Sequence, residues 1–175
     1  MNDRIPVMYD RALRPEWIDF ALEQYLQSTN EDALRKVLCD YLRPQVRGIE
    51  TVTKTARQLQ RTVGYKSCLT RDKLAAIHRR MSAISPDQRA PLRLQLLSES
   101  TPFVDDCMTA MKRLAVLGVK GVKIEHIYER LVAKYGDRSM VYRRVRYVLQ
   151  TLAFLGVVEN RNQRWFLITN DHGLI

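Results

Sequence analysis

The sequence has few of the residues that build catalytic or metal centres. Its three cysteines, Cys39, Cys68 and Cys107, lie too far apart for a CxxC pair or a disulfide framework. Its three histidines share no ligand spacing with one another or with the cysteines. It also lacks a glycine-rich phosphate loop, a GxSxG motif and an HExxH motif. We therefore expect no cofactor, no bound metal and no enzymatic activity.

Long apolar runs are missing as well. None approaches the roughly 18 residues that a membrane-spanning helix needs. The chain does not open with a charged and then apolar signal segment. We expect a cytoplasmic protein without a membrane partner, in which Cys39 and Cys107 are buried free thiols.

Acidic residues are scarce relative to basic ones. The 29 lysines and arginines against 19 aspartates and glutamates give a formal net charge of +10. Residues 1–50 carry 7 basic and 9 acidic side chains, residues 51–100 carry 10 and 3, and residues 101–175 carry 12 and 7. The positive charge therefore belongs to the middle and C-terminal parts. Such an excess favours an anionic partner but does not define a fold.

Apolar spacing and helix-start residues predict a mainly helical chain. Pro15 and the Thr101-Pro102 pair suit first turns, and Ser28-Thr29-Asn30 before two acids is a strong helix start. With 46% apolar residues the chain has enough material for one good core or two small ones. The expected helices are 15–27, 31–42, 46–63, 70–84 and 102–117, with a turn and a new helix start within 86–98.

The most informative segment is residues 139–168. At helical spacing, one face of residues 139–155 is apolar and the opposite face is basic, and Gly156 is a natural helix stop. Residues 157–160 and 164–168 have the composition of two short strands, which predicts a hairpin with the loop Arg161-Asn162-Gln163.

Residues 119–168 resemble the winged helix-turn-helix superfamily. The resemblance rests on the order helix, helix, basic hairpin and on the LxxLGxV motif at residues 152–158. It implies a supporting helix at 122–135, a recognition helix at 139–155 and a wing at 161–164. For the extra strand that often precedes the supporting helix, the only candidate is residues 116–119.

These patterns give a predicted fold class that is mainly α: an N-terminal helical bundle followed by a C-terminal winged-helix module with one β-hairpin. The expected boundaries are an arm at 1–13, the bundle at 14–100, a connecting helix at 101–118, the winged-helix domain at 119–170 and a tail at 171–175. No glycine- or serine-rich linker separates the two parts.

The polar face of the predicted recognition helix is the first candidate for DNA contact. It lacks acids and offers arginine and glutamine groups that can bond to base edges. A solvated surface or a protein contact would have the same composition, so both remain open. The candidate residues are Arg138, Ser139, Arg143, Arg144, Arg146, Tyr147 and Gln150.

Two further polar groups extend this candidate interface. The wing residues Arg161, Asn162, Gln163 and Arg164 are placed to reach phosphates or an adjacent groove, although every hairpin needs a polar tip. The helix at 46–63 carries a second basic face made of Arg47, Lys54, Arg57 and Arg61, with Thr55 and Gln58 nearby. This face is either a second phosphate-binding surface or a source of solubility and intrachain ion pairs.

The function that these features favour is non-catalytic binding of double-stranded DNA, by a regulator or an accessory subunit of a DNA-processing system. The alternative is a winged-helix module for protein assembly, or an RNA-binding adaptor, because fold alone does not decide function. The sequence leaves open a protein partner for the bundle and a homodimer.

Overall fold

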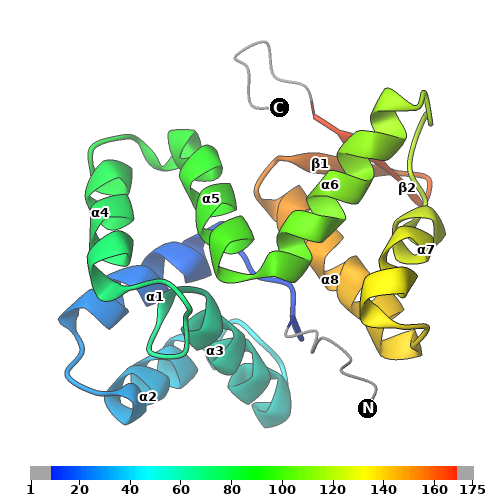
Figure 1. Ribbon diagram of the computed structural model, residues 1–175. Coiled ribbons are helices and arrows are strands. Elements are labelled where there is room, and N and C mark those ends of the chain that lie inside the picture. Colours follow the sequence, from blue (N-terminus) through cyan, green and yellow to red (C-terminus); the bar gives the residue numbers. More distant parts are fainter. Residues whose placement is uncertain (1–8, 169–175) are drawn as a thin grey trace. The chain divides into compact units, whose positions relative to one another are not determined.

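The computed structural model describes residues 9–168, and contacts among them divide the chain into two compact units (Figure 1). The N-terminal bundle is residues 13–100, and the C-terminal unit is residues 101–168 together with residues 9–12. The predicted fold class is confirmed, because the protein is mainly helical and has a two-stranded antiparallel hairpin near its C-terminus.

The N-terminal bundle consists of short helices, and two of them, α2 and α4, start at residues whose side chains cap the first turn. The Asn30 side chain accepts a hydrogen bond from Ala33 N at 2.9 Å, and the Thr70 side chain accepts one from Lys73 N at 3.3 Å. Pro15 occupies the first turn of its helix. The elements are α1 (Pro15–Gln27), α2 (Glu31–Leu42), α3 (Ile49–Val63), α4 (Arg71–Ser82), a 3-10 turn η1 (Pro86–Arg89) and α5 (Ala90–Ser100).

Helix α3 packs on three sides, against α1, α2 and α5. Two residues that were expected beside its basic face, Thr55 and Gln58, are buried instead, whereas the apolar Ile49 is 87% exposed. Because neighbouring helices pack on several sides of α3, they cover some of its polar side chains as well as its apolar ones. The hydroxyl of buried Thr55 donates to Thr51 O at 2.8 Å.

A partly buried ion-pair cluster joins α1 to η1 and α5. Arg93 Nε donates to Asp19 Oδ1 at 2.8 Å, and Arg89 Nη1 donates to Asp19 Oδ2 at 3.0 Å. The Arg93 side chain is only 8% exposed, and the Asp19 carboxylate balances its charge inside the protein. Two of the basic residues between positions 51 and 100 therefore serve packing and are not offered to a ligand.

The C-terminal unit consists of three helices and the hairpin. Helix α6 packs against α7, α8 and β2, and α8 packs against α7 and β1 (Figure 1). The helix expected to connect the two parts is therefore the first helix of this unit. The elements are α6 (Pro102–Val116), α7 (Ile124–Tyr135), α8 (Ser139–Phe154), β1 (Val158–Arg161) and β2 (Arg164–Leu167).

A single bridge adds the segment before α7 to the edge of the hairpin. Val122 N donates to Trp165 O, and Trp165 N donates to Val122 O, both at 2.8 Å. The candidate strand at residues 116–119 was wrong, because Val116 ends α6 and the extended residue comes six positions later. The bridge also explains why the supporting helix begins at Ile124 and not at residue 122.

The hairpin has a two-residue turn. Arg161 pairs with Arg164, so Arg161 belongs to β1 and the predicted three-residue loop was wrong. Asn162 and Gln163 have φ values of 50° and 62°. Positive φ at both central positions matches the twist of the flanking strands, and asparagine tolerates it better than glutamine.

We expect Gln163→Gly to stabilise the C-terminal unit by about 0.5–1 kcal/mol, because glycine adopts the left-handed conformation without a Cβ clash. Thermal unfolding would measure the gain. Asn162→Gly is the matched control and should change stability less, because asparagine already adopts this conformation readily. A loss of stability in Gln163→Gly would contradict the turn assignment.

Candidate nucleic-acid interface

Helix α8 has three faces with different surroundings. The apolar face predicted from the sequence is confirmed, because its residues are buried in the C-terminal unit. They are Val141, Val145, Val148, Leu149 and Leu152. This burial fixes the rotation of α8 about its axis and thereby determines which polar side chains remain available.

The second face of α8 is covered by residues 9–12. The Tyr9 side chain is fully buried, and its hydroxyl donates to Thr151 Oγ1 at 2.8 Å. Burial raises the pKa of the Tyr9 phenol well above its usual range. Arg144 Nε donates to Asp10 Oδ1 at 3.0 Å, and the Arg11 guanidinium lies 5.8 Å from the centre of the Tyr147 ring.

This arm changes the status of two predicted contact residues. Arg144 is 16% exposed in its ion pair with Asp10, and the Tyr147 hydroxyl accepts a hydrogen bond from Arg11 at 3.3 Å. Both side chains therefore contribute to holding the arm. At helical spacing, residues 144, 147 and 151 form one continuous stripe under it.

The third face of α8 is polar and open. Arg143 and Arg146 are exposed, and Gln150 is half-buried. These residues follow one another at spacings of three and four, so their side chains lie along one side of the helix. Ser139 is exposed at the first turn, whereas Arg138 Nε donates to Tyr135 O at 3.1 Å and caps the preceding helix.

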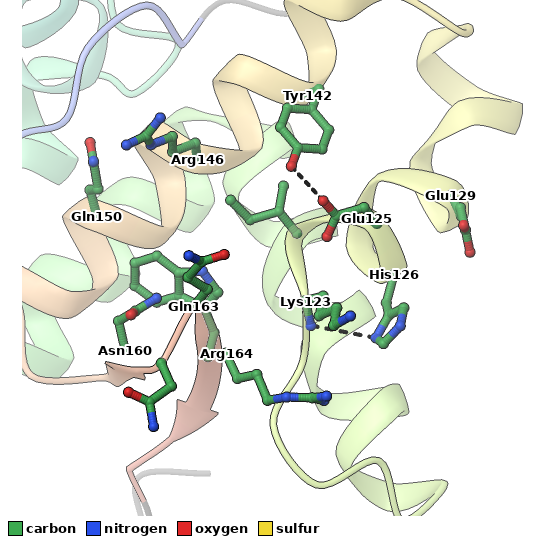
Figure 2. A pocket seen from close by; sticks show the side chains of 13 residues that line it. Lys123, Glu125, His126, Glu129, Tyr142, Arg146, Gln150, Asn160, Gln163 and Arg164 are labelled. Atoms are coloured by element: carbon green, nitrogen blue, oxygen red, sulfur yellow. Dashed lines mark hydrogen bonds between the residues drawn. The ribbon is translucent and has the colours of Figure 1, made fainter.

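A groove of about 1120 Å³ brings this open face together with the hairpin and the start of α7. Figure 2 shows Arg146 and Gln150 from α8 on one side, with Asn160, Gln163 and Arg164 from the hairpin nearby. The predicted candidates that line the groove are Arg146, Gln150, Asn162, Gln163 and Arg164. The tertiary structure thus joins the two predicted groups into one concave polar surface.

The groove carries both signs of charge. Arg146, Arg164 and Lys123 supply positive charge, and Glu125 and Glu129 supply negative charge near the start of α7. The Tyr142 hydroxyl donates to Glu125 Oε1 at 2.7 Å (Figure 2). The backbone N–H of Glu125 and this hydroxyl hold the pKa of the Glu125 carboxyl below its usual range, so it is ionised at neutral pH.

Sequence reasoning missed the other residues that line the groove, among them Tyr142, Lys123 and Asn160. Tyr142 precedes Arg146 by four residues, so helical spacing could have placed both on the same face. Lys123 and Asn160 carry no such local signal, because the bridge at Val122 and the strand pairing bring them to the groove.

Both arginines of the hairpin, Arg161 and Arg164, have partners within the C-terminal unit. Arg161 forms an ion pair with Glu159 and lies 5.6 Å from the centre of the Phe166 ring. Arg164 Nη1 donates to Gly121 O at 3.3 Å, although its side chain still lines the groove. Arg164 is therefore the better placed of the two for a ligand in the groove.

The second predicted surface, on α3, has a less uniform charge than its sequence indicates. Arg47 and Arg57 are exposed, and Arg61 is half-buried. Lys54 is paired with Glu50 one turn earlier. Among the neighbouring cations, Lys66 lies 2.8 Å from Glu31 and Lys73 lies 2.8 Å from Glu99. Intrachain ion pairs thus neutralise part of this surface.

Residues 9–168 contain no cluster of three or more histidine, cysteine, aspartate or glutamate side chains with the geometry of a metal site. Within the same range, no helix has the length and apolar character needed to cross a membrane. His172 lies outside the described residues. What the groove offers chemically is hydrogen-bond donors and acceptors, with side chains of both charges.

Comparison with known proteins adds no assignment, because no protein-family model matches the chain and a search of curated proteins finds no significant match.

Proposed function

We propose that the C-terminal unit binds double-stranded DNA through the groove between α8 and the hairpin. The observation that carries the proposal is the convergence of Arg146 and Gln150 from α8 with Asn162, Gln163 and Arg164 from the hairpin on one concave surface. Arg143 extends the same side of α8 beyond the groove. The winged-helix resemblance of residues 119–168 agrees with this use of the helix and the hairpin.

The chemistry of these side chains suits a duplex. An α-helix fits the major groove of DNA, where arginine makes bidentate contacts to guanine and glutamine makes them to adenine. A hairpin beside such a helix reaches phosphates or the next groove, where asparagine, glutamine and arginine all donate. We assign Arg146 and Gln150 to base edges and Arg164 to the backbone.

The biological role that we propose is a non-catalytic, cytoplasmic regulator or accessory subunit. The groove supplies donors for recognition, and its ionised Glu125 is engaged by Tyr142, so the side chains around it favour binding over bond cleavage. Exposed Arg47 and Arg57 on α3 would add phosphate contacts of low sequence specificity. RNA binding is the second candidate function. Comparing the affinity for a DNA duplex with that for an RNA duplex of the same sequence distinguishes the two.

We expect the affinity for duplex DNA to fall linearly with salt on a double-logarithmic plot, with a slope of roughly −0.9 for each phosphate contact. Fluorescence anisotropy with a labelled duplex at several salt concentrations would measure this slope. Unlabelled duplex RNA and single-stranded DNA should compete poorly. An affinity that does not change with salt would overturn the proposal, as would binding that strictly requires magnesium.

A further inference from the structure

A second groove in the C-terminal unit is apolar and lies between the end of α6 and strand β2. It measures about 520 Å³ and is lined by the last turns of α6, the segment 119–122 and residues 165–167. We call it the apolar groove. The groove between α8 and the hairpin is called the polar groove from here on. Apart from Trp165, the two grooves have no lining residue in common.

The apolar groove has a closed floor and an open rim. Met111, Val122 and Trp165 form part of its lining and are 0%, 3% and 7% exposed, so the core of the unit lies directly beneath. Val116, by contrast, is 88% exposed at the edge. A solvent-exposed valine beside a concave apolar surface is typical of a binding site, because a partner can bury both.

Charge around the apolar groove is of one sign. Lys112 and Lys120 line it, and no carboxylate does. Within residues 9–168, neither lysine has an ion-pair partner. Arg113 is exposed on the neighbouring position of α6. An apolar floor with cationic edges is complementary to a ligand that is apolar in its centre and acidic at its flanks.

We propose that the apolar groove docks an amphipathic helix of a partner protein whose apolar face is flanked by acidic residues. Helix-in-groove recognition uses anchors spaced one turn apart, which suits a concave surface bordered by a helix and a strand. Nucleic acid has no apolar face of this kind. A membrane would need a protruding apolar surface, whereas the floor here is concave. This inference does not depend on the proposed DNA binding.

The test uses the full-length protein and a displayed library of 16-residue helical peptides, with selection for binders and removal of those that also bind Val116→Glu. Val116 is 88% exposed, so this substitution leaves the core intact. Ile49→Glu, at 87% exposure on the bundle, is the matched control. We expect enriched peptides with apolar residues one turn apart and glutamate or aspartate beside them.

Fluorescence anisotropy with one enriched synthetic peptide then measures the contributions of the groove residues. Val116→Glu and the double variant Lys112→Glu/Lys120→Glu should each weaken binding about tenfold or more, because both oppose an acidic peptide. Ile49→Glu should bind like the wild type. The double variant should recover binding when the acidic residues of the peptide are replaced by lysine.

Three results would overturn the proposal. The first is a selection that enriches no peptide sensitive to Val116→Glu. The second is an enrichment that is indifferent to charge or favours basic peptides. The third is self-association of the wild type that Val116→Glu abolishes, because the face would then belong to a second copy of the chain. Duplex binding measured in parallel should be unchanged in Val116→Glu, so failure here is distinguishable from failure of the DNA-binding proposal.

Discussion

Replacing Tyr9 with alanine should lower the free energy of unfolding of the C-terminal unit by about 3–5 kcal/mol, the usual cost of truncating a fully buried aromatic side chain. Tyr9 is 0% exposed and its hydroxyl bonds to Thr151 on α8. The variant loses both the packing of the ring and the hydrogen bond. Hydrogen exchange of the amides of α8, measured under native conditions, would report the change.

Tyr9→Phe separates the two contributions. It keeps the ring and removes only the hydroxyl, so it should cost about 1 kcal/mol plus any penalty for an unsatisfied Thr151. The ion pair between Asp10 and Arg144 stays in place in both variants. If Tyr9→Ala costs less than 1 kcal/mol, residues 9–12 are not an integral part of this unit and the open surface of α8 is larger than described.

The helices were predictable because their signals are local. Pro15, Asn30 and Thr70 mark helix starts by satisfying or avoiding backbone donors within a few residues, so α1 and α2 have the predicted bounds. The buried face of α8 was predictable for the same reason. Periodicity of apolar residues depends only on which side of a helix meets the core.

Features that depend on contacts distant in sequence were not predictable. Tyr9 and Thr151 are 142 positions apart, and nothing near Tyr9 in the sequence indicates that it belongs beside α8. The bridge between Val122 and Trp165 involves one residue pair and leaves no alternating pattern. The turn at Asn162-Gln163 lacks the glycine that normally indicates positive φ, so a longer loop was expected.

The candidate site shows the same division. Helical spacing correctly placed Arg143, Arg146 and Gln150 on a side of α8 away from the core, where they are exposed or half-buried. Helical spacing also placed Tyr147 on this polar side, because it does not belong to the apolar stripe that faces the core. The arm then occupies Tyr147 and Arg144. A helical wheel describes one helix, and it cannot show which distant segment covers a polar face.

Replacing Arg146 with alanine should have the largest effect on DNA recognition, because a lost base-edge contact costs about 1–3 kcal/mol and relaxes the preference at one base pair. Arg164→Ala should weaken all duplexes alike and reduce the salt slope by about one contact. Arg130 is exposed on α7 and does not line the polar groove, so Arg130→Ala is the matched control. Anisotropy titrations on a selected and a random duplex would measure both effects.

The triple variant Lys54→Ala/Arg57→Ala/Arg61→Ala tests whether α3 adds a second contact surface. Because Lys54 is paired with Glu50, its loss should contribute less than the loss of exposed Arg57. We expect the triple variant to weaken specific and random duplexes by the same factor and to lower the salt slope without changing preference. If Arg146→Ala and Arg164→Ala both bind like the wild type while the triple variant does not, the α3 surface of the bundle is the DNA-binding element. If all three bind duplexes like the wild type, neither surface is the DNA-binding element and the proposed assignment of contacts is wrong.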